Sequence, residues 1–135
     1  PNTSFRLCDI GGAAGVDADL LLKMGVPARI TILDFQKARV TFPNNVTSIV
    51  HDMFQAFPPT MRGKCDFFWL DFVIQDFSDS KVVSMLRHLR AAVGSLGSRL
   101  AMLQHVLGVH GAQLESFKAE MDLWQMVGFG GRERS

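Results

Sequence analysis

The sequence predicts an α/β domain built on a mostly parallel sheet. Short apolar runs alternate along the chain with stretches of helical periodicity, which is typical of parallel strands joined by right-handed crossovers. A glycine-rich turn directly follows the first apolar run, at the place where such folds bind nucleotides. The 135 residues are enough for one hydrophobic core, so we expect a single domain over residues 1–135.

Five strands are expected in the spatial order 3-2-1-4-5, with helices on both faces of the sheet. Apolar runs bounded by glycine, proline or asparagine predict strands over residues 5–10, 29–34, 46–50, 65–74 and 99–106. The run 65–74 is the most apolar and predicts a central strand. Helical spacing of apolar residues predicts helices over residues 17–24, 79–93 and 113–127. Ser78 is the expected cap of the second helix, and the third has Leu114, Phe117, Met121 and Trp124 on one face.

Composition narrows the class of protein. The chain is 47% hydrophobic and 20% charged with a net charge of +1, and it has no dense basic run, which argues against nucleic acid as a partner. Neither a membrane-spanning stretch nor a secretory signal is visible, so a cytoplasmic location is expected. Cys8 and Cys65 lack the close ligand spacing of a metal site. We expect both to be reduced and buried, in the neighbouring first and fourth strands.

The glycine turn and a later acid predict a cofactor pocket. Asp9 and the run Gly11-Gly12-Ala13-Ala14-Gly15 end the first strand, and Asp34 ends the second strand 19 residues beyond Gly15. Glycines allow the backbone to approach a cofactor closely, and a carboxylate at the second strand end can bind ribose hydroxyls. A tight turn with an ordinary solvated aspartate is the alternative. The second glycine comes one place too early for a dinucleotide motif. With Asp9 the run instead resembles the D-x-G-G-x-x-G turn of methyltransferases.

Several segments, in order along nearly the whole chain, resemble the small-molecule O-methyltransferases related to caffeate and acetylserotonin O-methyltransferases. The segments are residues 9–15, 32–34, 51–54, 70–79, 103–104 and 131–135. The resemblance implies a Rossmann-like class I methyltransferase fold that binds S-adenosylmethionine. It also implies methyl transfer to a hydroxyl group of a small aromatic or secondary-metabolite acceptor.

The resemblance assigns cofactor contacts to a defined set of residues. That set is Asp9, Gly11, Gly12, Gly15, Asp34, Asp52, Met53 and Asp71. The glycines would line the methionine end and the sugar of the cofactor, Asp34 would bind the ribose, and Asp52 and Met53 would lie beside the adenine. A strand-end cap for Asp52 and simple core filling for Met53 are the alternatives.

Three positions depart from the family pattern. Gln75 stands where the family has its catalytic histidine, and Gln104 stands at or near the acid that orients that histidine. An amide has no useful basicity near neutral pH, so neither residue can act as a general base. Asp71 replaces a lysine that contacts the cofactor, whereas Glu133 keeps the family residue. We therefore expect weak S-adenosylmethionine binding that depends on Asp34.

Two architectural departures are also expected. The family's N-terminal helical dimerisation domain and the last strands of its sheet have no counterpart in residues 1–135. Three readings of the function follow: an O-methyltransferase domain with little or no activity, an inactive homologue that binds cofactor or a sister subunit through helix 113–127, and a pocket reused for a non-methyl reaction.

Overall fold

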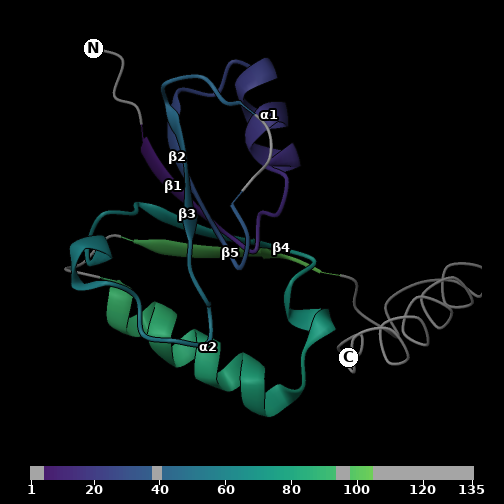
Figure 1. Cartoon of the computed structure of the whole chain (residues 1–135), viewed down its shortest axis with the longest axis vertical. Helices are drawn as coiled ribbons and strands as arrows, with labels where there is room; N and C mark the ends of the chain where they lie inside the picture. Colours follow the sequence, from purple (N-terminus) through teal and green to yellow (C-terminus); the bar gives the residue numbers. More distant parts are fainter. Residues whose placement is uncertain (1–4, 38–40, 94–97, 105–135) are drawn as a thin grey trace, which may run out of the picture.

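Five parallel strands form one sheet in the order β3-β2-β1-β4-β5, with β1 at its centre (Figure 1). The structure is a computed structural model that describes residues 5–37, 41–93 and 98–104. Its strands are β1 (Phe5–Ile10), β2 (Ala28–Asp34), β3 (Val46–Val50), β4 (Phe67–Asp71) and β5 (Arg99–Leu103). The predicted parallel sheet and its strand order are confirmed.

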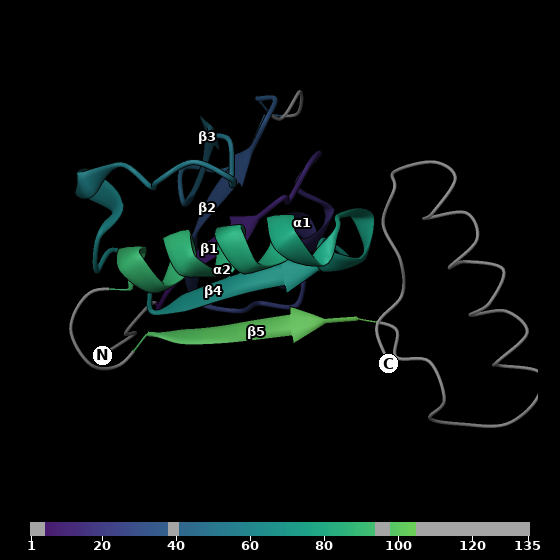
Figure 2. The same cartoon turned by 90° about the horizontal axis from the view of Figure 1, so that it is seen from below.

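Helices α1 (Val16–Lys23) and α2 (Asp79–Ala92) lie on opposite faces of the sheet (Figures 1 and 2). Side chains of a strand point alternately to the two faces. In β1, Leu7 therefore belongs to the apolar cluster beneath α1, whereas Cys8 and Ile10 belong to the cluster beneath α2. The predicted helices 17–24 and 79–93 are both present. Helix α1 begins and ends one residue earlier than predicted, and α2 ends one residue earlier.

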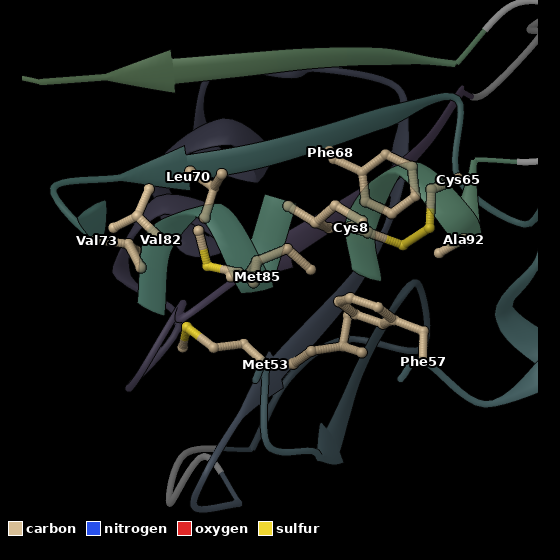
Figure 3. Packing of buried hydrophobic residues seen from close by; sticks show 13 residues of the cluster. Cys8, Met53, Phe57, Cys65, Phe68, Leu70, Val73, Val82, Met85 and Ala92 are labelled. Atoms are coloured by element: carbon tan, nitrogen blue, oxygen red, sulfur yellow. A yellow bond between two sulfur atoms is a disulfide. The ribbon is translucent and has the colours of Figure 1, made fainter. Parts of the chain in front are cut away.

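The larger apolar cluster joins α2 to the sheet (Figure 3). Met85 has no exposed surface, and it lies among side chains from β1, β4 and the segment that follows β3. The buried members from these elements include Cys8, Ile10, Met53, Phe57, Phe68 and Leu70, and α2 itself adds Val82 and Leu89. The spacing of Val82, Met85 and Leu89 along α2 is that of a single helical stripe, which explains why this face of the helix is buried.

The cysteines differ from expectation in one respect. Both are buried, and β1 and β4 are neighbours as predicted, but Cys8 and Cys65 are joined by a disulfide, with Cα atoms 5.7 Å apart (Figure 3). The expectation of two reduced thiols is therefore wrong in this structure. Cys65 also lies two residues before β4 rather than within it. From there its Cα lies within the distance of Cys8 at which disulfides form, a contact between segments far apart in the sequence that spacing does not reveal.

The fourth strand is shorter than the predicted run 65–74. It ends at Asp71 because Phe72 has a φ of 51°, a left-handed conformation that a strand cannot continue through. The chain then forms a 3-10 turn over Ile74–Asp76. Ser78 is the first cap residue of α2, but its hydroxyl pairs with the hydroxyl of Ser80 rather than with a backbone N–H group of the helix.

The fifth strand ends at Leu103, so Gln104, which was predicted to be part of it, is not in a strand. Residues 105–106 of that predicted strand and the predicted helix 113–127 lie outside the described residues. Within the described ranges, the longest helix is α2 with 14 residues, and none of the helices is long and apolar enough to cross a bilayer.

Candidate functional site

The residues that the sequence singles out meet at one edge of the sheet, where the parallel strands end. The glycine turn follows β1, Asp34 is the last residue of β2, and Asp71 is the last residue of β4. Because β1 lies between β2 and β4, the turn stands between the two acids. This is the position at which open α/β sheets bind ligands.

The turn depends on its glycines for two different reasons. Gly11 and Gly15 have φ values of 76° and 78°, which an L side chain adopts only with strain. Gly12 is needed for space, because a Cβ atom there would lie 2.2 Å from Oδ2 of Asp9. At Gly15 a Cβ atom would also lie 2.3 Å from Cζ of Phe42, so an aromatic side chain packs directly on the turn. The backbone is thereby held close to the strand ends and open towards the edge.

Asp34 ties the end of β2 to the turn. Its Oδ2 accepts a hydrogen bond from the backbone N–H of Ala13 at 3.0 Å, and its Oδ1 accepts one from Gln36 at 3.3 Å. A carboxylate has about four lone-pair positions, so both oxygens can accept further bonds. The carboxylate that the sequence assigns to a ribose is therefore already fixed in place beside the glycine turn.

Asp52 and Met53 follow β3 at the same edge, and each makes the contact expected of a structural residue. Oδ1 of Asp52 accepts the backbone N–H of Phe54 at 2.9 Å, which closes a local turn. Met53 is 3% exposed and belongs to the cluster beneath α2. Its Cε lies 3.4 Å from the position a Cβ atom of Gly11 would take. The assignment of both residues to an adenine stays a prediction.

Three carboxylates gather beside the turn, and we call Asp9, Asp17 and Asp71 the acid cluster. Asp9 of β1 and Asp71 of β4 face α1, and Asp17 lies in the first turn of α1, where its Oδ2 accepts the indole N–H of Trp69 at 2.8 Å. Asp17 was not predicted as a site residue from the sequence. Acids are common in the first turn of a helix because they interact favourably with the helix dipole, so this one did not stand out. Its place two positions after Gly15, the last glycine of the turn, was the available signal.

Asp9 and Asp71 of the acid cluster hold protons more tightly than ordinary carboxylates do. Burial, and then the negative charges of Asp17, Asp71 and Asp34, raise the pKa of Asp9 to about 7. Burial, followed by the charge of Asp17 and a hydrogen bond with it, raises the pKa of Asp71 to about 6. Near neutral pH these side chains therefore titrate in the range where a bound charge can change their protonation.

Gln75 and Gln104 are brought together at the same edge. The 3-10 turn after β4 buries Gln75, which is 4% exposed, and Gln104 follows directly after β5. The amide Nε2 of Gln104 donates a hydrogen bond to Oε1 of Gln75. Two neutral amides thus pair at the positions that the family resemblance gives to a base and its orienting acid. Glu133, the third residue of that set, lies outside the described residues.

Comparison with known proteins places this arrangement in a family. The sequence model of the O-methyltransferase domain matches residues 3–135. The chain belongs to the O-methyltransferase domain family. Among curated relatives, it is 27% identical over 133 residues to chavicol O-methyltransferase of Ocimum basilicum. This alignment covers 96% of this chain and 36% of the relative. The chain therefore spans about a third of the length of the curated relatives that it matches.

Solved structures of related proteins agree with this fold. The human N-acetylserotonin methyltransferase, solved in complex with S-adenosylmethionine, superposes with a TM-score of 0.79 at 20% identity and covers 99% of this chain and 39% of its own. LepI in complex with S-adenosylmethionine superposes with a TM-score of 0.77 at 25% identity, covering 98% of this chain and 34% of its own. The O-methyltransferase fold of the described strands and helices is thus shared with both proteins.

Proposed function

We propose that this O-methyltransferase-like domain binds S-adenosylmethionine at the glycine turn and transfers methyl groups to neutral hydroxyl acceptors slowly or not at all. The observation that carries the proposal is the hydrogen-bonded pair of Gln75, which is buried in the 3-10 turn beyond β4, and Gln104, which is half-buried directly after β5. The acceptor expected from the family is a small aromatic or secondary-metabolite hydroxyl compound.

The proposed cofactor binding is supported by the residues at the carboxyl ends of β1 and β2. Gly11 and Gly12 line a cavity there, and the backbone N–H of Ala13 in the same turn donates a hydrogen bond to Asp34. A fixed carboxylate beside a glycine turn suits a ribose, whose two hydroxyl groups can donate to the two oxygens. The relationship to LepI, solved with S-adenosylmethionine, supports this ligand.

The catalytic half rests on the chemistry of the amide pair. Methyl transfer to a hydroxyl group requires the acceptor to lose a proton, and a general base at the acceptor oxygen typically accelerates that step about 10²- to 10⁴-fold. Gln75 has no basicity to offer, and the amide of Gln104 that holds it cannot supply any. An acceptor that is already ionised needs no base, because positioning then supplies most of the acceleration.

A radiolabelled binding and transfer assay tests both halves. Equilibrium dialysis with labelled S-adenosylmethionine should show binding that Asp34→Ala weakens about tenfold or more. Asp19→Ala is the matched control, because Asp19 is exposed and pairs with Lys23 on the outer side of α1. If Asp34→Ala binds as well as the unmodified chain, the site assignment is wrong.

The transfer arm compares two phenols that differ in acidity at one pH. We expect label to appear only on the phenol that is ionised at that pH, and slowly. Rapid methylation of the neutral phenol by the unmodified chain would contradict the proposal and would require a base other than Gln75.

A further inference from the structure

The acid cluster lines a small cavity against the glycine turn. The cavity measures about 190 Å³, and its walls are Asp9, Asp17 and Asp71 together with residues 11–14 and Val16. Asp34 lies across the turn at the end of β2, so the 5′ tail of a nucleoside whose ribose is bound at Asp34 would enter this cavity. This argument rests on the proposed function.

The carboxylates in this cavity have unfilled bonding capacity. Asp9 is 1% exposed, and its Oδ2 has no hydrogen-bond partner among the described residues. Oδ1 of Asp71 is also buried and without a partner in the same part of the chain. A buried carboxylate oxygen that lacks a donor is costly, and a ligand that brings a donor removes that cost.

No cation of the described chain neutralises the acid cluster. The two ion pairs found within residues 5–37, 41–93 and 98–104 are Arg6 with Asp66 and Lys23 with Asp19, and neither involves the cavity. On its other side the cluster borders an apolar cavity of about 580 Å³, whose walls include Leu7, Phe67 and Trp69. Apolar walls strengthen the interaction of any charge placed beside these carboxylates.

We infer that the cavity selects a nucleoside whose tail carries an ammonium group and no carboxylate. An ammonium group brings three donors and a positive charge to Asp9, Asp17 and Asp71. A carboxylate on the same tail would bring a negative charge into a cavity already lined by three acids. The described acids do not form a group suited to hold a metal ion, so an organic cation is the matching ligand.

Calorimetric titration of the full 135-residue chain with three nucleosides tests this selection. The probes are 5′-methylthioadenosine with an uncharged tail, S-adenosylmethionine with ammonium and carboxylate groups, and the decarboxylated form of S-adenosylmethionine. We expect the decarboxylated form to bind about tenfold or more tightly than S-adenosylmethionine, the effect of about one charge-assisted hydrogen bond. Asp71→Asn should shrink that ratio, and Asp19→Asn should preserve it.

The protons released on binding give a second test, which does not depend on how well Asp71→Asn folds. The raised pKa values of Asp9 and Asp71 imply that binding of the ammonium tail releases protons near pH 6.5, with Asp17 and Asp34 as the other acids facing Asp9. Titrations in two buffers of different ionisation enthalpy measure this release, which should be greater for the decarboxylated form than for 5′-methylthioadenosine.

The outcomes separate this inference from the proposed function. The selection would be overturned if S-adenosylmethionine bound as tightly as its decarboxylated form, or more tightly. If 5′-methylthioadenosine still bound in a way that depends on Asp34, the proposed nucleoside site would remain supported. Absence of binding by all three probes would overturn the proposed function and this inference together. Equal proton release by the charged and uncharged tails would also contradict the selection.

Discussion

Asp9 should make the domain less stable as the pH rises, and Asp9→Asn should remove most of that loss. Burial and three neighbouring acids raise the pKa of Asp9 in the folded protein from 3.8 to about 7. The folded state therefore binds the proton more tightly than the unfolded chain. The resulting stabilisation is complete below about pH 4 and is lost as the pH rises through about 7. For these two pKa values, the free energy of unfolding falls by about 2.5 kcal/mol between pH 5 and pH 8.

Urea unfolding at pH 5 and pH 8, followed by far-ultraviolet circular dichroism, measures this loss. Between pH 5 and pH 8, the free energy of unfolding of Asp9→Asn should fall by about 2.5 kcal/mol less than that of the unmodified chain. A smaller slope should remain, because burial and Asp17 also raise the pKa of Asp71. Asp19→Asn should keep the full slope, since Asp19 is exposed on the outer side of α1. If Asp9→Asn loses as much stability as the unmodified chain, the burial argument for Asp9 is refuted.

Three further predictions concern the turn, the disulfide and the amide pair. Gly15→Ala should lower the free energy of unfolding in urea by at least about 1 kcal/mol more than Gly25→Ala does. Both glycines have φ above 70°, but only a Cβ atom at Gly15 would meet another side chain. Equal losses of stability in the two variants would contradict this packing. Reduction of the Cys8–Cys65 disulfide, which spans 57 residues, should lower the free energy of unfolding by about 4 kcal/mol, and thiols that react in the untreated native protein would exclude the disulfide. Gln104→Ala should cost about 1–3 kcal/mol, because it leaves the buried carbonyl of Gln75 without its donor, and an unchanged unfolding midpoint would refute the pairing.

The sheet could be predicted from the sequence because its signals are local. Apolar runs bounded by glycine, proline or asparagine located β1, β2 and β3 to within one residue at each end and gave the start of β5, and the crossover rule then determined the strand order. The end of β4 could not be predicted, because the left-handed conformation of Phe72 leaves no mark in an apolar run that continues through it. The 3-10 turn that contains Gln75 follows directly after this end of the strand.

The site was predictable only in part, for a physical reason. Motif spacing indicated Gly11 and Asp34, since one directly follows a strand and the other ends one. Asp71 was indicated by the family resemblance alone, because the strand was expected to continue past it. Asp17 and the Cys8–Cys65 bond depend on which side chains meet across elements, and such contacts follow from packing that spacing does not encode. The pairing of Gln75 with Gln104 is a contact of the same kind, although the sequence had pointed to both residues separately.

Nuclear magnetic resonance of the ¹⁵N-labelled chain, titrated with 5′-methylthioadenosine, tests the central claim that the glycine turn is a nucleoside site. The uncharged tail makes this test independent of the acid cluster. We predict saturable shifts of the backbone amides of Gly11, Gly12, Ala13 and Gln36, the last two of which donate to Asp34 in the free protein. Loss of these shifts in Asp34→Ala would agree with the account. Shifts confined to the cavity beside Leu89 and Leu100, or no shifts at a saturating nucleoside concentration, would contradict it.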